Sequence, residues 1–214
     1  ESQELTARAA EPETAENGAR WLAVPGWGLT GRKRLDRKEL GWLWHGFSTR
    51  QGGLSRAYCA EGAAGELNLG FTATDEREIV ERNRRPFVEA LTGDAQAPLI
   101  TLKQFHSNLV VRVGLEDALR AVPRKADGAM TDEPGVLLAV QTADCLPVLV
   151  ADRKRRAVAA FHAGWRGTVK RIVELGVGRM RAECVSKLDV RTAAIGTGAG
   201  GCCYSLGEGV LSEV

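Results

Sequence analysis

The chain has 214 residues, of which 44% are apolar, and a formal net charge of +2. A chain of this length can bury a substantial core, and its basic residues are scattered in short turns, which argues against nucleic acid as a partner. No apolar run approaches the ~20 residues that span a bilayer, and no signal-peptide pattern opens the sequence. Five cysteines without framework spacing favour a reduced setting over a disulfide scaffold. We therefore expect a cytoplasmic protein that contacts neither membranes nor nucleic acids.

The N-terminal part divides into an arm and the beginning of a folded domain. Residues 1–20 are acidic, alanine-rich and poor in large apolar side chains, so we expect a flexible arm. Trp21–Val24 and the aromatic run Trp42–Phe47 predict strands, and Gln51–Gly53 predicts a turn. Residues 54–70 are rich in glycine and alanine, which predicts irregular backbone of the kind that often displays binding groups.

The middle of the chain predicts one helix and several short strands. The helix is expected to begin at Thr74 or Asp75, where a capping residue precedes acidic side chains and an apolar face. Pro86 is expected to bend or divide it. Residues 114–125 predict a polar loop with one helical turn. Short apolar runs predict four strands, at Pro98–Leu102, Leu109–Val113, Ala126–Met130 and Gly135–Val140.

A hairpin is the best-defined pattern in the chain. Two apolar runs, Leu146–Ala151 and Ala157–Phe161, are joined by the charged turn Asp152–Arg156. At about 3.3 Å per residue, the two strands would bring Cys145 and His162 to the same end of the sheet.

The residues after the hairpin predict a return to helical structure. A glycine-rich turn, Gly164–Thr168, is followed by apolar residues at helical spacing as far as Met180. Val190–Ile195 predicts a further strand. Residues 196–203 form a glycine-rich turn, and residues 204–214 predict a final helix or loop.

Three side chains that can bind metal stand at predicted strand ends. His106, Cys145 and His162 are separated by 39 and 17 residues, which matches no compact zinc finger or ribbon. Zn²⁺ takes imidazole nitrogen and thiolate sulfur at about 2.0 and 2.3 Å, and three protein ligands with one open position are typical of a catalytic site. The alternative is that Cys145 is a small buried hydrophobe and each histidine is a packing residue. Spacing alone leaves both interpretations open.

A second interpretation needs no metal. Cys145 could be a nucleophile with His162 as its base, and the amides of Gly164–Thr168 could form an oxyanion hole.

Several polar residues are candidates for phosphate binding or proton transfer. The Gly164–Thr168 turn could hold phosphate at the start of a helix, with Arg166 adding a bidentate contact. Arg50, which follows an aromatic run, is a further candidate for facing a cleft. Asp144 can act as acid or base only if the strand breaks there, because in a regular strand it points away from Cys145.

Six short motifs follow one another along the chain: HGFSTRQGG (45–53), LNLG (67–70), KQFH (103–106), TADCLPVLV (142–150), HAGWRGT (162–168) and IGTGAGGCCYSLGEGV (195–210). In this order they resemble the YfiH-like family. That family has been described as multicopper polyphenol oxidase or laccase-like, and its members are now described as purine nucleoside phosphorylases. The resemblance covers roughly residues 42–210, and the pair ADC and HAGWRG at this separation is specific.

The resemblance implies an α/β fold, a mixed β-sheet sandwich flanked by helices, here expected as a single domain over residues 21–214. It implies a zinc site formed by His106, Cys145 and His162. It also implies phosphorolysis of adenosine, inosine, guanosine and 5′-methylthioadenosine, with adenosine deamination as a further activity. We expect two sets of site residues: a catalytic set of Cys145, His162, His106 and Asp144, and a set that binds nucleoside or phosphate, Arg50, Arg166, Asn68 and Gln104.

The sequence also departs from the family pattern. KQFHS replaces the commoner KQVHG, and the last motif has Thr197, Ala199, Gly201 and Ser205 where Pro, Ile, Pro and Glu are usual. Family members usually continue several dozen residues past Val210 and include a basic segment, so we expect a C-terminal portion to be missing. A metal-free cysteine hydrolase and a nucleoside-binding protein without turnover therefore stay as alternatives. Copper oxidase chemistry is disfavoured, because three histidines and two methionines cannot furnish several copper centres.

Overall fold

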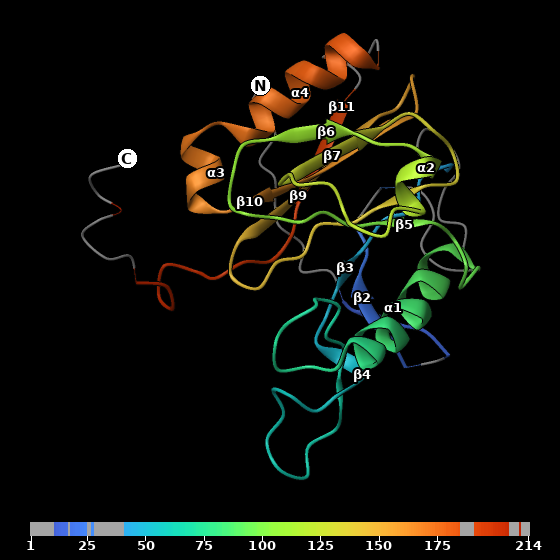
Figure 1. The fold of residues 1–214 in the computed structure, drawn as a ribbon, viewed down its shortest axis with the longest axis vertical. Helices are drawn as coiled ribbons and strands as arrows, with labels where there is room; N and C mark the ends of the chain where they lie inside the picture. The colour runs from blue at the N-terminus through green and yellow to red at the C-terminus, as the bar shows by residue number, and fades with distance from the viewer. Residues whose placement is uncertain are drawn as a thin grey trace. The chain divides into compact units, whose positions relative to one another are not determined.

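The computed structural model describes residues 11–16, 18–24, 27, 41–184, 191–205 and 210. The chain forms two compact units, Glu1–Gln96 and Ala97–Val214, and each is considered by itself. Sheets that contain both parallel and antiparallel pairs, together with helices, confirm the mixed α/β class expected from the sequence (Figure 1). Among the described residues, none of the helices has the length and hydropathy of a membrane span.

The first unit contains a three-stranded antiparallel sheet in the order β1-β2-β3, a further strand and one long helix. Its elements are β1 (Glu13–Thr14), β2 (Arg20–Leu22), β3 (Phe47–Ser48), β4 (Gln51–Ser55) and α1 (Arg77–Thr92). Since β1 pairs with β2, residues 13–14 belong to the sheet and not to the flexible arm predicted over residues 1–20. Residues 1–10 and 17 of that arm lie outside the described residues.

Two predictions in the first unit are wrong. The aromatic run Trp42–Phe47 contributes only Phe47 to a strand, β3. The turn predicted at Gln51–Gly53 is the beginning of strand β4. Gly52 has φ +89°, and a side-chain carbon there would lie 1.8 Å from the carbonyl oxygen of Gly18. The glycines therefore allow close backbone contact within a strand, where we expected chain reversal.

The predicted helix of the first unit is α1, and its start lies slightly later than expected. It begins after Glu76, whose side chain makes no capping hydrogen bond. The Asp75 carboxylate, one of the two expected caps, instead accepts hydrogen bonds from Ser55 and, at 2.8 Å, from the Asn68 amide. Pro86 lies inside the helix and does not divide it.

The second unit is built on a five-stranded sheet in the order β11-β9-β10-β7-β6. All neighbours are antiparallel except β6 and β7, and a separate parallel pair joins β5 and β8. The strands are β5 (Leu99–Ile100), β6 (Val110–Arg112), β7 (Gly128–Thr131), β8 (Leu137–Leu138), β9 (Leu146–Asp152), β10 (Ala157–Ala163) and β11 (Arg191–Ile195). The helices are α2 (Leu115–Ala118), α3 (Trp165–Val169) and α4 (Ile172–Glu183).

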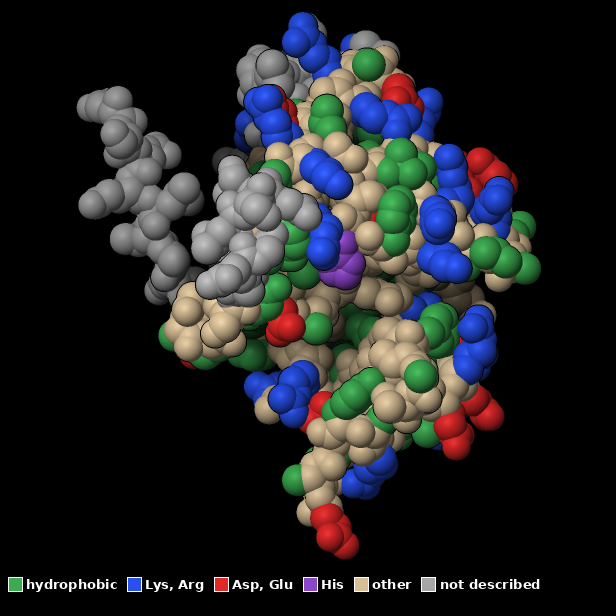
Figure 2. Space-filling view, turned by 60° about the vertical axis from the view of Figure 1, so that its left-hand side comes forward, with side chains coloured by type: hydrophobic (Ala, Val, Ile, Leu, Met, Phe, Trp, Pro, Cys, Tyr) green, Lys and Arg blue, Asp and Glu red, His purple; other side chains and the backbone are tan. Residues whose placement is uncertain are grey.

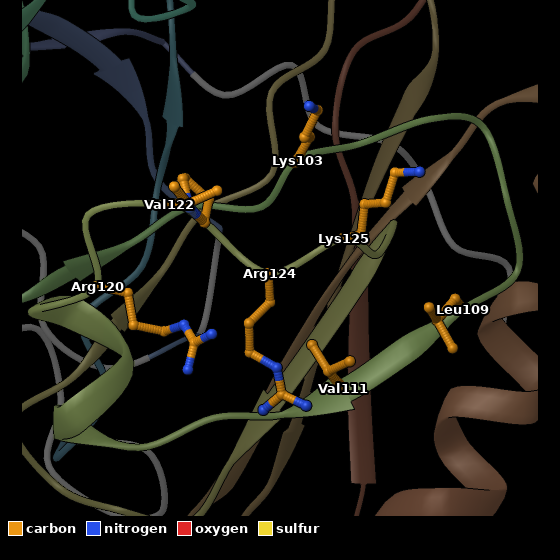
Figure 3. A pocket seen from close by; sticks show the side chains of 8 residues that line it. Lys103, Leu109, Val111, Arg120, Val122, Arg124 and Lys125 are labelled. Atoms are coloured by element: carbon orange, nitrogen blue, oxygen red, sulfur yellow. The ribbon is translucent and has the colours of Figure 1, made fainter.

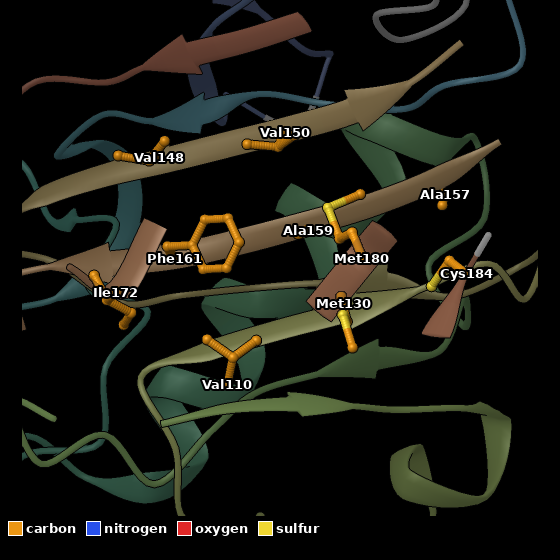
Figure 4. Packing of buried hydrophobic residues seen from close by; sticks show 10 residues of the cluster. All are labelled: Val110, Met130, Val148, Val150, Ala157, Ala159, Phe161, Ile172, Met180 and Cys184. Atoms are coloured by element: carbon orange, nitrogen blue, oxygen red, sulfur yellow. The ribbon is translucent and has the colours of Figure 1, made fainter. Parts of the chain in front are cut away.

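Side chains on the two faces of this sheet enter two different hydrophobic clusters. Val110 and Met130 pack with Phe161, Ile172 and Met180 on the face covered by α4 (Figure 4). Their neighbours along the strands, Val111 and Ala129, join the second cluster, which also contains residues of β5 and β8. This alternation is the period-two pattern of strands that are covered on both sides.

The predicted hairpin is confirmed, whereas the helix after it is divided. β9 and β10 pair antiparallel over seven residue pairs, ending with His162 opposite Pro147 and Ala163 opposite Leu146. The expected single helix is split into α3 and α4, because Arg171 takes a left-handed conformation with φ 60°. α3 is therefore a five-residue helix and offers little macrodipole for the predicted phosphate site.

Alanine substitutions at two glycines of α4 are expected to change the free energy of unfolding in opposite directions, because only one of the glycines packs closely against the sheet. A side-chain carbon at Gly176 would lie 2.1 Å from the Phe161 ring, whereas one at Gly178 would meet nothing within 4 Å. We expect Gly176→Ala to lower the free energy of unfolding by about 1–3 kcal/mol through overpacking. Gly178→Ala should raise it by up to about 1 kcal/mol through helix propensity. Urea unfolding of both variants measures these changes. Equal changes in the free energy of unfolding would show that Gly176 does not pack closely against Phe161.

Candidate metal centre

The second unit brings the three predicted ligands together at one end of the hairpin. Cys145 immediately precedes β9, His162 lies in β10, and His106 lies in the loop between β5 and β6. Their ligand atoms all lie within 4.8 Å of one another, and the two imidazole rings meet edge to face with centroids 4.9 Å apart. The hairpin supplies two of the residues and the 101–109 loop supplies the third.

Asp127 orients the buried ligand. Its fully buried carboxylate lies 2.8 Å from Nδ1 of His162, which is 4% exposed. An ionised carboxylate only accepts, so Nδ1 carries the proton and Nε2 keeps its lone pair. A histidine held in this way by a carboxylate is typical of metal ligands.

The same carboxylate fixes the loop that carries His106. Asp127 accepts hydrogen bonds from the backbone N–H groups of Phe105 (3.2 Å), His106 (3.0 Å) and Ser107 (2.7 Å), and from the Ser107 hydroxyl (2.7 Å). His106 itself has φ 61°, a conformation that costs energy for a residue other than glycine. The loop is thus held in a strained shape by a single buried anion that also holds His162.

Two pKa values in the site are displaced. Burial opposes ionisation of Asp127, but the hydrogen bonds from His162, Ser107 and Phe105 outweigh it and hold its pKa below the ordinary value. Burial raises the pKa of the Cys145 thiol, and the nearby carboxylates of Asp144 and Asp127 act in the same direction. A cation at Cys145 would reverse this effect, because it stabilises the thiolate.

The residues present fit a borderline-soft cation. The donors are one thiol and two imidazoles, the ligand types that Zn²⁺ takes in proteins, and their ligand atoms all lie within 4.8 Å of one another. Among the described residues this trio is the group of histidine, cysteine and acidic side chains that could hold an ion. His106 is exposed and Cys145 is half-buried, so one side of the trio is open to solvent.

Gly164 leaves the space in which the three side chains meet. A side-chain carbon there would lie 3.0 Å from Sγ of Cys145 and 3.1 Å from Cδ2 of His106. We expect Gly164→Ala to displace both ligands and to weaken zinc binding about tenfold, the smaller of the effects typical for supporting residues of metal sites. Competition with a chromophoric chelator measures this. Gly178→Ala, which adds the same methyl group in open space, should bind zinc like the original chain. An equal loss of zinc affinity in both variants would show that the methyl group at position 164 does not act by displacing the ligands.

Gln104 and Asp144 have roles that the sequence did not indicate. Both ends of the Gln104 amide are engaged by the backbone of Gln141, with Nε2 donating to its carbonyl and Oε1 accepting from its N–H, each at 2.8 Å. Gln104 therefore ties the KQFH segment to the segment that leads to Cys145. Asp144 is exposed and precedes β9, and its carbonyl accepts a hydrogen bond from Ala199 at 2.9 Å. Strand β9 begins only at Leu146, so Asp144 lies outside the regular strand that would turn its carboxylate away from Cys145. Its acid–base role stays a prediction.

The three other predicted binding residues are placed as follows. Arg166 is exposed, and its guanidinium stacks 4.2 Å from the Trp165 ring centroid. Arg50 and Asn68 belong to the first unit. Arg50 forms an ion pair with Glu66, and the hydrogen bond with that carboxylate raises the pKa of Arg50. The Asn68 amide donates to Asp75, and its oxygen accepts from the Gly70 N–H at 3.0 Å. Binding roles for all three stay predictions.

A separate hollow of the second unit is lined by cations. Its volume is about 650 Å³. Figure 3 shows four cationic side chains around it, Lys103, Arg120, Arg124 and Lys125. None of the three candidate ligands lines it, so we keep it apart from the metal centre. Figure 2 shows a histidine side chain at the surface, next to side chains of the Lys and Arg class.

Asp127, which holds both His162 and the backbone of His106, was not among the site residues predicted from the sequence. The residue stands in Ala126–Met130, which we interpreted only as a short strand with a turn. A charged residue inside an otherwise apolar run was the available signal, because such groups are almost never fully buried without partners.

Comparisons with known proteins identify the family of this chain. The family model described as multi-copper polyphenol oxidoreductase laccase matches residues 44–214. The chain is 34% identical over 174 residues to a protein of Bacteroides thetaiotaomicron and 36% identical over 173 residues to one of Deinococcus radiodurans, both named purine nucleoside phosphorylase. These alignments cover 78% and 79% of this chain and 62% of each relative. The chain thus spans less than two thirds of their length.

Solved structures show the same relationship. YlmD of Geobacillus stearothermophilus superposes with a TM-score of 0.74 at 26% identity, covering 95% of this chain and 71% of that one. The hypothetical protein YfiH of Bacillus licheniformis gives a TM-score of 0.69 at 30% identity, covering 78% and 63%. With a family model that matches most of its residues, this chain belongs to the family described as multi-copper polyphenol oxidoreductase laccase, the YfiH-like family.

Proposed function

We propose that this chain is a zinc-dependent purine nucleoside phosphorylase that cleaves adenosine, inosine, guanosine or 5′-methylthioadenosine with phosphate and also deaminates adenosine. The observation that carries the proposal is the convergence of His106, Cys145 and His162 within 4.8 Å. The name purine nucleoside phosphorylase, borne by relatives 34% and 36% identical to this chain, supports the reaction class. Five cysteines without framework spacing, all free where described, support a cytoplasmic setting.

In this proposal the protein's own residues hold the ion and leave one side of it open. Cys145 contributes the thiolate, and His106 and His162 contribute imidazoles. Asp127 accepts from Nδ1 of His162, so Nε2 would be the ring nitrogen available to the cation. When bound, zinc supplies a Lewis acid and acidifies a coordinated water, which suits both deamination and proton delivery to a departing purine.

Polar residues outside the trio would bind substrate and move protons. Arg166 is exposed in α3, which directly follows the strand that carries His162, and its guanidinium can bind phosphate in a bidentate geometry. Arg50 and Asn68 are proposed to bind phosphate or nucleoside as well. The exposed Asp144 carboxylate would accept and return the proton at the purine amino group in deamination. Gln104 contributes by fixing the Gln141 backbone.

Zinc is preferred to copper because of the donor set. Several copper centres need many imidazoles and thioethers, whereas the chain has three histidines and two methionines. One of the histidines, His45, is buried and accepts a hydrogen bond from the Val24 N–H. Two imidazoles and one thiolate with an open position match a catalytic zinc site.

One observation favours a second candidate, a metal-free cysteine hydrolase. The contact between Asp127 and His162 would orient a catalytic base as well as a metal ligand. In that case Cys145 attacks the substrate directly. The two candidates differ in their response to chelators and in the role of His106, which only the metal site requires.

The test is a phosphate-dependent assay on adenosine, with elemental analysis of the same sample. The proposal expects near one zinc per chain, release of free adenine only when phosphate is present, and loss of both after chelation. Adenine release that needs no phosphate, persists after chelation and is lost when Cys145 is alkylated would support the hydrolase. Nucleoside binding without product would leave a binding protein.

A further inference from the structure

Two neighbouring cysteines stand at the surface of the second unit with their sulfur atoms in contact. Cys202 and Cys203 are both exposed, and their Sγ atoms lie 3.0 Å apart. Two thiols that touch each other and are open to solvent can react as a pair.

The backbone around the pair keeps the sulfur atoms together. The N–H of Cys203 donates to the carbonyl of Gly200 at 2.9 Å, which closes a tight turn with Cys202 inside it. The segment that leads to this turn is hydrogen-bonded to the beginning of β9 and to the residues just before it, since Gly196 donates to Pro147 and Ala199 donates to Asp144, each at 2.9 Å. The turn is thus anchored at one end, and its backbone holds the two thiols close together.

We propose that Cys202 and Cys203 form a reversible vicinal disulfide by exchange with a small-molecule disulfide such as oxidised glutathione. The thiolate of one cysteine attacks the glutathione disulfide, a mixed disulfide forms, and one reduced glutathione leaves. The neighbouring thiol loses its proton and attacks the protein sulfur of the mixed disulfide, and the second reduced glutathione leaves. The protein dithiol is oxidised by two electrons, and one glutathione disulfide becomes two thiols.

Ring strain makes this disulfide easy to reverse. Consecutive Cα atoms lie about 3.8 Å apart across a trans peptide. Ordinary disulfides join Cα atoms about 4.4–6.8 Å apart, and shorter separations store strain that favours reduction. Strained, exposed disulfides are the labile kind that respond to the glutathione balance, whereas structural ones resist it.

The other cysteines are placed differently. Cys59 donates its thiol to the backbone carbonyls of Ser55 (3.2 Å) and Ala64 (3.3 Å). Cys184 is buried in the hydrophobic cluster beneath α4. Cys145 belongs to the metal centre. The proposal therefore concerns one pair, and it does not depend on the proposed zinc chemistry.

The test treats the reduced full chain with oxidised glutathione and locates the products by peptide mass spectrometry. The original chain should lose two hydrogen atoms at the Cys202–Cys203 peptide and retain no glutathione there. Cys202→Ser and Cys203→Ser should each keep one glutathione on the remaining sulfur, because no neighbour can displace it. Cys59→Ser, the control, should close the ring like the original chain. Reduced glutathione in excess should reopen the ring.

Two results would overturn the proposal. One is a stable glutathione adduct on Cys202 or Cys203 of the original chain, which would show that the neighbour does not attack. The other is a pair that stays reduced under oxidised glutathione while Cys59 is modified. Both serine variants change exposed positions, and matching urea unfolding curves would show that their fold is retained.

Discussion

Replacement of Cys145 with serine is expected to lower bound zinc from near one per chain to near none and to abolish phosphorolysis. A serine hydroxyl has roughly the shape of the thiol but is not ionised near neutral pH, so it cannot replace a thiolate as a ligand. His162→Ala should have the same effect, because it removes the ligand that Asp127 orients. Elemental analysis and the adenosine assay on the same preparations measure both consequences.

Cys59→Ser provides the matched control for this experiment. The substitution is the same, but the Cys59 thiol contacts only backbone carbonyls of the first unit, so zinc content and turnover should not change. A Cys145→Ser chain that lacks zinc and still cleaves adenosine at the original rate would refute the role of the metal. If it retains zinc but loses turnover, the sulfur is not needed to hold the metal, and Cys145 acts in the reaction itself.

Local patterns predicted those parts of the second unit that depend on neighbours in the sequence. The β9–β10 hairpin follows from two apolar runs around a charged turn, and its register sets Cys145 and His162 at one end of the sheet. The sequence suggests that His106 lies near them but does not determine it. Its position depends on the placement of the 101–109 loop, since His106 is 39 residues from Cys145 in the chain and is held there by tertiary contacts.

Two features that the sequence did not predict depend on contacts between segments distant in the chain. Gly52 is in a strand because the Gly18 carbonyl approaches it, and no local rule shows that approach. Gln104 was expected to bind nucleoside or phosphate, a role that stays a prediction, and both ends of its amide are hydrogen-bonded to the Gln141 backbone, 37 residues away. The break at Arg171 places a left-handed residue where the apolar spacing predicts continuous helix.

Asp127→Asn should show that one buried carboxylate supports both the fold and the metal centre. In the original chain the carboxylate accepts from three backbone N–H groups, from the Ser107 hydroxyl and from His162. An amide of the same size places N–H groups against some of these donors, and breaking a buried charged network of this kind costs about 3–5 kcal/mol. We expect the free energy of unfolding of the metal-free chain to fall by about 3 kcal/mol.

The zinc affinity of the same variant distinguishes the positioning of the metal ligands by Asp127 from its contribution to the stability of the fold. His162 would lose the acceptor that fixes its tautomer, and the His106 loop would lose its anchor, so affinity should fall about 10–100-fold. The control is Asp132→Asn, the same substitution at a partly exposed ion pair with Arg112 (2.6 Å), which should cost about 1 kcal/mol or less. If Asp127→Asn unfolds more easily but binds zinc like the original chain under conditions in which it is fully folded, Asp127 stabilises the fold without orienting the ligands. In that case the convergence of His106 and His162 must be maintained by the packing of β10 and the 101–109 loop alone.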